Sequence, residues 1–189
     1  MSRGTPNALT RFIFFCALAA TIVVAAPAAA SPNRPCYGAN RAPAEATYHQ
    51  LRTSLLCLIN RARERRGIQS LRFSPELRRS ATGHSWDMVR NGYFSHYGSS
   101  GSDLTVRVAH AGYLARANAY LVGENIGGGP GRQFGSPAAV FRSWMHSPGH
   151  RDNLLSSRFR DVGVGVARGY PNGGGSSAAT FTLDLGTRH

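Results

Sequence analysis

The sequence contains no lysine and only nine acidic residues. All 22 basic residues are therefore arginines, and the formal net charge is +13 at pH 7. This excess of positive charge favours anionic partners such as cell-wall polymers, acidic lipid headgroups or nucleic acid. The one dense arginine cluster, at 61–66, is interpreted as a solvated helix face. Nucleic acid is not an expected partner, because the chain has neither a nucleic-acid-binding motif nor a basic stripe interleaved with aromatic residues.

Two other signatures are missing from the sequence. The glycine-rich run G-G-G-P-G at 127–131 lacks the lysine and the spacing of a phosphate-binding loop, so nucleotide binding is discounted. No heptad repeat and no long exposed strand can be recognised, and we therefore expect a monomer.

Long apolar runs are also scarce, because the chain has only one, at 12–26. This run is shorter than the roughly 20 residues that a membrane-spanning helix needs. Arginines precede it, and small residues at Ala28 and Ala30 follow it, which is typical of a secretory signal peptide. We predict a signal peptide at 1–30, a secreted, extracellular protein and no membrane span after cleavage; an uncleaved anchor is the alternative.

The chain that remains after cleavage is long enough to form one domain with one core. We expect an extended, proline- and asparagine-rich arm at 31–43 and a single domain at 44–189. Removing Arg3 and Arg11 with the signal peptide lowers the formal charge by two, from +13 to +11.

Cysteine is rare, with three residues in the whole chain. Cys16 lies in the predicted signal peptide, which leaves Cys36 and Cys57. An even pair in an exported protein indicates a disulfide, here between the arm and the first helix. The alternative is that Cys57, in the apolar run L-L-C-L-I, is a buried thiol.

Apolar spacing and end signals predict four helices. The first runs from about 44 to 66, and the second begins at S-P-E, 74–76, and ends at Gly92. A short helix follows near 104–111, and another starts at S-P, 136–137, with Trp144 as its core anchor.

The C-terminal part of the chain has the alternation of strands. V-G-V-G-V at 162–166 predicts a strand with one buried face, and 180–185 predicts a second strand that pairs with it as an antiparallel hairpin. The glycine-rich segment after Ile126 is interpreted as a loop.

Three histidines and one glutamate lie in different local settings. His84 is on the apolar stripe of the second helix and is interpreted as a structural core histidine. His96 follows G-Y-F-S on a loop, and His150 follows a Ser-Pro-Gly turn that ends a helix. Glu124 lies between an apolar run and the glycine-rich segment, which is an unusual place for a simple surface charge.

Five motifs occur in an order that resembles a known family. They are H-S-W-D-M at 84–88, F-S-H at 94–96, G-E-N-I at 123–126, W-M-H-S-P-G-H-R-D-N-L-L at 144–155 and V-G-V-G-V at 162–166. Together they resemble the bacterial branch of the CAP superfamily, which groups cysteine-rich secretory proteins, antigen 5 and pathogenesis-related proteins; its domain is also called the SCP domain. The resemblance covers about 51–186 and implies an α+β fold, an α/β/α sandwich with a small antiparallel sheet between helices.

The resemblance also implies a cavity lined by two histidines and two acidic residues, which holds a divalent cation such as zinc in some members. The matching positions are His96, Glu124, His150 and Ser147. Ser147 stands where the family has its second acid, so the implied metal ligands reduce to His96 and His150. Asp152 is close in sequence and could substitute for the missing acid.

Two functions follow from these expectations, and no catalytic residue is assigned. The preferred hypothesis is a non-catalytic extracellular binding module for a lipid, a glycan or an anionic cell-envelope component. The alternative is a weak zinc-dependent hydrolase that acts on peptide or cell-wall material.

Overall fold

The structure is a computed structural model that describes Met1, residues 35–171, Gly173 and residues 175–189. Apart from Met1, the predicted signal peptide at 1–30 lies outside these residues. Among the described residues, no helix has both the length and the apolar character needed to cross a membrane.

A four-stranded sheet with the order β1-β3-β4-β2 forms the centre of the domain. The strands are β1 (Arg72–Phe73), β2 (Tyr120–Pro130), β3 (Asp161–Arg168) and β4 (Ala178–Arg188). β3 and β4 form the predicted antiparallel hairpin, and β2 pairs antiparallel with β4. The sheet is not wholly antiparallel, because β1 pairs parallel with β3 through two residues.

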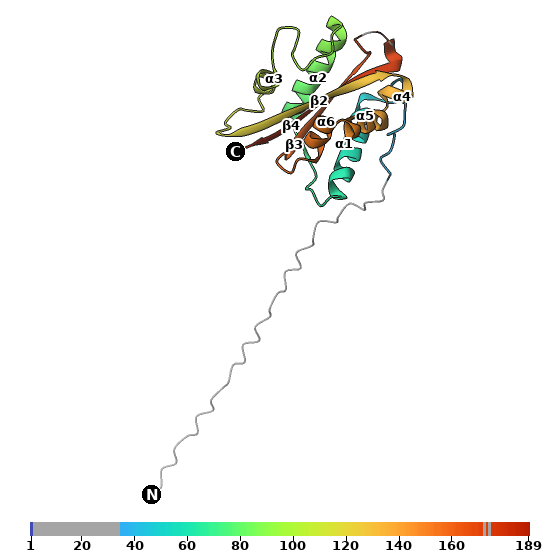
Figure 1. The fold of residues 1–189 in the computed structure, drawn as a ribbon. Coiled ribbons are helices and arrows are strands. Elements are labelled where there is room, and N and C mark those ends of the chain that lie inside the picture. The colour runs from blue at the N-terminus through green and yellow to red at the C-terminus, as the bar shows by residue number, and fades with distance from the viewer. Residues whose placement is uncertain (2–34, 172, 174) are drawn as a thin grey trace. The chain divides into compact units, whose positions relative to one another are not determined.

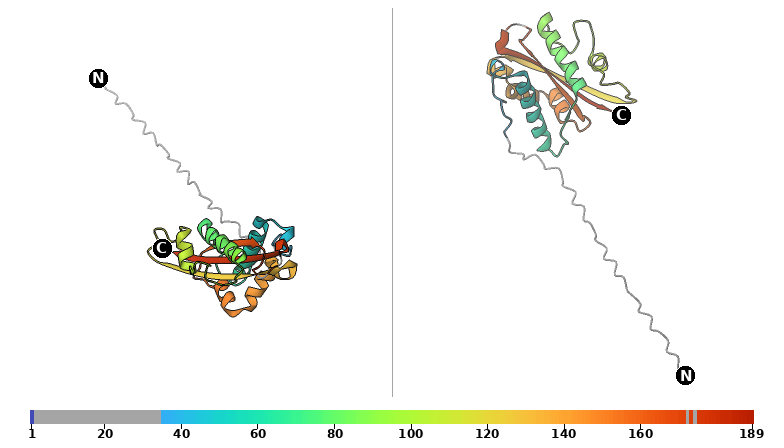
Figure 2. Two further views of the ribbon diagram at one scale, coloured as in Figure 1. Left: turned by 90° about the horizontal axis from the view of Figure 1, so that it is seen from above. Right: turned by 180° about the vertical axis from the view of Figure 1, so that it is seen from behind.

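Helices cover both faces of this sheet, as the α+β sandwich requires (Figure 1). They are η1 (Pro43–Glu45), α1 (Tyr48–Glu64), α2 (Pro75–Asn91), α3 (Leu104–His110), α4 (Gly131–Gly135), α5 (Pro137–His146) and α6 (Pro148–Leu155), with a short η2 (Gly175–Ser177) between β3 and β4. Figure 2 shows α2 on one side of the sheet and α5 and α6 on the other. The predicted sandwich is therefore confirmed.

The helix ends follow the local sequence signals. The Ser74 hydroxyl accepts a hydrogen bond from the Leu77 N–H, and Gly92 ends α2 with a φ of 67°, so both predicted ends of this helix are confirmed. The first helix begins later than predicted. Thr47 and Gln50 form a reciprocal cap in front of Tyr48, while Pro43–Glu45 make a separate 3-10 turn.

The main core lies between the sheet and α1, α5 and α6. It includes the valines of β3, the apolar residues of β4 and one face of α1: Leu51, Leu55, Ile59, Val162, Val164, Val166, Phe181, Leu183 and Leu185. The Trp144 side chain of α5 is 1% exposed, and its indole N–H donates to the Ile126 carbonyl of β2 at 2.9 Å. This residue therefore ties β2 to the core.

The opposite face of the sheet is covered by α2 at very short range. A Cβ added at Gly163 or Gly165 would overlap the α2 backbone at Leu77 or Ala81. The V-G-V-G-V pattern thus has two functions: its valines fill the core, and its glycines let a helix backbone lie directly on the strand.

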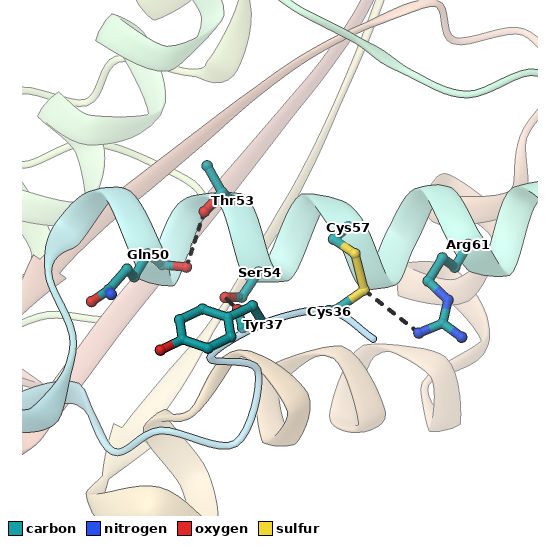
Figure 3. The surroundings of a disulfide bond; sticks show 7 residues. All are labelled: Cys36, Tyr37, Gln50, Thr53, Ser54, Cys57 and Arg61. Carbon is teal, nitrogen blue, oxygen red and sulfur yellow. Dashed lines mark hydrogen bonds between the residues drawn. A yellow bond between two sulfur atoms is a disulfide. The ribbon is translucent and has the colours of Figure 1, made fainter. Parts of the chain in front are cut away.

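The N-terminal arm is joined to α1 by a Cys36–Cys57 disulfide, with a Cα–Cα distance of 5.7 Å (Figure 3). The predicted bridge is therefore present. The described part of the arm is not extended as predicted, because residues 37–40 form a turn. Ser54 of α1 donates to the Tyr37 carbonyl at 2.5 Å and holds this turn against the helix.

One residue of the arginine cluster at 61–66 is not solvated. Arg63 is 0% exposed, and its guanidinium donates to the backbone carbonyls of Gln69, Leu154, Ser156 and Phe159. The interpretation of the whole cluster as a solvated face is therefore wrong at Arg63. Its guanidinium is buried because it supplies hydrogen-bond donors to backbone carbonyls near the ends of helices and in loops, where a regular helix or sheet partner is missing.

Candidate functional site

Glu124 lies in the middle of β2, at one edge of the sheet, and its side chain is only 4% exposed. The His96 Nδ1 is 2.7 Å from its Oε1, and the Arg107 guanidinium donates to its Oε2 at 2.5 Å. His96 comes from the loop after α2 and Arg107 from α3. Three segments far apart in the sequence therefore meet at one carboxylate, which we call the Glu124 cluster.

The Glu124 carboxylate is ionised in this setting. Burial alone would raise its pKa, but the hydrogen bond from His96 and the positive charge of Arg107 outweigh burial and lower the pKa below its ordinary value. An ionised carboxylate only accepts hydrogen bonds, so the His96 Nδ1 carries the proton and donates it. The remaining ring nitrogen, Nε2, belongs to a side chain that is 54% exposed.

Asp184 is a second carboxyl group beside Glu124 that sequence reasoning missed. It lies opposite Glu124 in the β2–β4 register and is 0% exposed. Burial, followed by the negative charge of Glu124, raises the pKa of Asp184 well above its ordinary value. Burial and the neighbouring charge therefore favour the neutral form of Asp184, whereas the partners of Glu124 favour its ionised form.

His84 also lies against this cluster, although its apolar setting in the sequence placed it outside the site. It is 1% exposed, its Nε2 donates to the Ser95 carbonyl at 2.9 Å, and the same nitrogen is 3.8 Å from the Glu124 carboxylate. Burial lowers the pKa of His84, and the attraction of Glu124 opposes this without reversing it. His84 is thus a neutral, buried histidine that touches the centre of the candidate site.

His150 approaches the same edge of the sheet from α6. Burial, and then the charge of His96, lower its pKa below the ordinary value. The His150 carbonyl accepts from the Asn125 amide at 3.0 Å, and Asn153 bonds to the Asn125 side chain at 2.9 Å. These amides attach α6 to β2 and fix the position of His150.

Ser147 occupies the junction of α5 and α6. Its backbone N–H donates to the Trp144 carbonyl at 3.2 Å, and its side chain makes no capping hydrogen bond to α6. Asp152, the predicted substitute for the missing acid, is exposed on α6. The structure therefore brings the His96 and Glu124 side chains into direct contact and attaches the His150 backbone to Asn125, the neighbour of Glu124 on β2.

The donor set does not match that of a catalytic zinc site. Such sites usually take three protein ligands. Both Glu124 oxygens are engaged by His96 and Arg107, and Asp184 is fully buried, so two of the expected ligands remain, the imidazoles of His96 and His150. In the part of the chain that the structure describes, no three His, Cys, Asp or Glu side chains are grouped to hold a metal ion. The His96–Glu124 contact is the arrangement in which a carboxylate orients a histidine ring, whose other nitrogen can then meet a metal ion or another ligand.

The fold and this cluster define an α+β sandwich with a histidine–glutamate site at the sheet edge. The family model described as "CAP: Cysteine-rich secretory protein family" matches residues 56–184. The chain belongs to this family, as its five motifs predicted.

Two curated proteins of Bacillus subtilis (strain 168) are similar in sequence. The "Uncharacterized membrane protein YlbC" is 35% identical over 116 residues, 61% of this chain and 31% of that protein. The "Uncharacterized protein YkwD" is 33% identical over 109 residues, 57% of this chain and 39% of that protein. The chain thus spans about a third of the length of these relatives.

Solved structures share the fold. An extracellular protein containing a SCP domain from Bacillus anthracis has a TM-score of 0.58 at 26% identity, over 74% of this chain and 43% of that chain. An outer surface protein from Borrelia burgdorferi has the same TM-score, 0.58, at 17% identity, over 71% of this chain and 90% of that chain.

Proposed function

We propose that this CAP protein is a secreted, non-catalytic module that binds a lipid, a glycan or another anionic component of the cell envelope at the Glu124 cluster. The observation that carries the proposal is the pairing of both Glu124 oxygens, one with His96 and one with Arg107. This pairing fixes the His96 ring while leaving the side chain half exposed. A preorganised, accessible imidazole favours ligand binding because little conformational entropy is lost when the ligand arrives.

The protonation states favour binding over hydrolysis. A general base works best when its pKa lies near the working pH, whereas the pKa of Glu124 is lowered and its carboxylate is paired with a guanidinium. Asp184, the neighbouring carboxyl, is fully buried and cannot reach a substrate. Neither group is therefore suited to activate a water molecule.

Two observations support an anionic ligand at the cell envelope. After removal of the predicted signal peptide, which carries Arg3 and Arg11, the formal charge falls by two from +13 to +11, and this positive charge attracts anions over distances longer than a hydrogen bond. The solved structure from Bacillus anthracis is described as an extracellular protein, which agrees with the signal peptide predicted at 1–30.

The binding proposal can be tested by cosedimentation of the purified protein with phosphatidylglycerol vesicles and with insoluble bacterial cell-wall sacculi. We expect His96→Ala to reduce binding to one of these probes about tenfold. His146→Ala is the matched control, because His146 is exposed on α5 and bonds only within its own helix, to the Arg142 carbonyl. Equal binding by the wild type and both variants would contradict a role for the Glu124 cluster.

Zinc titration distinguishes this function from the metal-dependent hydrolase. If the His96 and His150 rings share a zinc ion, calorimetry will show heat that disappears in both His96→Ala and His150→Ala. We expect at most weak binding, because the site offers two imidazoles. Tight binding together with zinc-dependent cleavage of cell-wall peptides would favour the hydrolase instead.

A further inference from the structure

A pocket lies at the edge of the sheet opposite to the Glu124 cluster, between α1 and α2. Its volume is about 330 Å³, and its lining includes Arg52 and Leu56 of α1, Phe73 of β1, Arg78 of α2, and Val162 and Val164 of β3. β1 pairs with β3 only through Asp161 and Val162, so the edge of β3 is open beyond this point. We call this site the β3-edge pocket.

The interior of this pocket is apolar. Val162 and Val164 form part of the main core and are 0% and 4% exposed, and Leu56 packs against the same core. Phe73, on the two-residue strand β1, is 57% exposed and borders the same apolar surface. An aliphatic group placed here would cover Phe73 and extend the core outward.

Two arginines without anionic partners border this apolar surface. In the described part of the chain, neither Arg52 nor Arg78 has an ion pair, and the Arg78 Nε is buried without a hydrogen-bond partner. The Arg78 guanidinium lies 5.8 Å from the centre of the Phe73 ring. None of the nine acidic residues lines the pocket.

The two guanidiniums also repel each other. Burial, and then the positive charge of Arg78, lower the pKa of Arg52. Arginine remains charged at any ordinary pH, so an anion bound between the two groups would be stabilised by both. No acidic residue lines the pocket, so a ligand is a candidate source of that anion.

We propose that the β3-edge pocket binds a single-chain amphiphile, an aliphatic chain that carries one carboxylate or phosphate head. The chain would lie on Val162, Val164 and Leu56, and the head would sit between Arg52 and Arg78, where guanidiniums bind such groups in a bidentate manner. A volume of about 330 Å³ is at the lower end for ligand pockets, which favours one chain over a bulky ring system.

This site is independent of the Glu124 cluster and of the function proposed for it. The two sites lie at opposite edges of the sheet and share no residue among those described. His96→Ala should therefore leave binding at the β3-edge pocket unchanged, so the two proposals can fail separately.

The test is calorimetric titration of the purified protein with laurate, dodecyl phosphate and dodecanol below their micelle or solubility limits. We expect laurate or dodecyl phosphate to bind, and the stronger of the two identifies the head group. Arg52→Gln with Arg78→Gln should weaken binding of the anionic ligand at least tenfold and leave dodecanol within about twofold. Arg65→Gln with Arg142→Gln removes the same charge from positions outside the pocket and should change neither.

A second variant tests the apolar part of the site. Thr53 is an α1 residue that also lines the pocket and lies outside the core, so Thr53→Phe fills part of the volume without disturbing the core. It should weaken laurate and dodecanol alike. The proposal is overturned if no twelve-carbon ligand binds the wild type, or if the two double-arginine variants bind laurate equally, provided that all variants keep the wild-type circular dichroism spectrum.

Discussion

Arginine guanidiniums have different surroundings at the two edges of the sheet. At the β2 edge, the Arg107 guanidinium is 10% exposed and bonded to a buried carboxylate. At the β3 edge, Arg52 and Arg78 face an apolar pocket without an acid. The protein supplies a buried counter-charge to Arg107 and none to Arg52 and Arg78 among the described residues. Arginine content alone therefore does not identify a binding surface; the distribution of the nine acids does.

The largest expected change in stability comes from removing the aromatic side chain that packs against each edge of the sheet. Trp144→Ala should lower the free energy of unfolding by about 4 kcal/mol, because it opens a cavity in the core and leaves the Ile126 carbonyl without its donor. Phe73→Ala, at the β3 edge, should cost less than about 1 kcal/mol, because that ring is 57% exposed. Urea denaturation measures both; similar losses would mean that the two edges are equally packed.

The next effect concerns the buried ion pair. Glu124→Gln should lower the free energy of unfolding by about 3 kcal/mol, because an amide cannot accept from both His96 and Arg107 and leaves a largely buried guanidinium without a counter-charge. The measurement is again the urea midpoint. A loss below about 1 kcal/mol would show that water solvates the Arg107 guanidinium in place of the carboxylate, and that the Glu124 cluster is more accessible to solvent than an exposure of 10% for Arg107 implies.

A smaller effect is expected from the neighbouring acid. Because the pKa of Asp184 is raised in the native state, the unfolded state ionises first as pH rises above about 4, and this lowers stability until pH passes the native pKa. Asp184→Asn removes this decline and should gain on the order of 1 kcal/mol at pH 7 relative to pH 4, compared with the wild type. An identical pH profile for both proteins would contradict a raised pKa of Asp184.

The smallest effect belongs to the exposed ion pair at the β3 edge. Arg72 and Asp161 are 3.3 Å apart, but the arginine side chain is 72% exposed. Arg72→Gln should therefore change the free energy of unfolding by about 0.5 kcal/mol or less. Chemical denaturation in low and high salt would measure it, and a loss comparable to that of Glu124→Gln would remove the contrast between the edges.

Local signals predicted most of the fold, and tertiary packing explains where they failed. The caps at Ser74 and Gly92 and the β3–β4 alternation act within a few residues, so they can be read from the sequence. β2 was interpreted partly as a loop because of its glycines. These glycines are needed for close packing: a Cβ at Gly127 would lie 2.7 Å from the Trp144 indole nitrogen, a contact formed by residues far along the chain.

The site was predicted in part for a similar reason. His96 and Glu124 belong to recognisable motifs, whereas Arg107 looks like a surface residue on a short helix. Asp184 belongs to the polar side of T-F-T-L-D-L, which ordinarily faces solvent. Here α2 covers that side with small polar residues, and Ser85 donates to the Thr182 hydroxyl at 2.9 Å. A strand with a polar stripe, together with a helix rich in serine, is the sequence signal that could have indicated that Asp184 is buried.

The glycines of β3 also decide which parts of the molecule can move. With the α2 backbone lying directly on Gly163 and Gly165, sliding or tilting of the helix would push it against the neighbouring chain atoms. We therefore expect α2 and β3 to move together as one rigid unit. Any rearrangement that accompanies ligand capture should be confined to the connecting segment that carries His96 and to α3, and hydrogen exchange should be faster there than in α2.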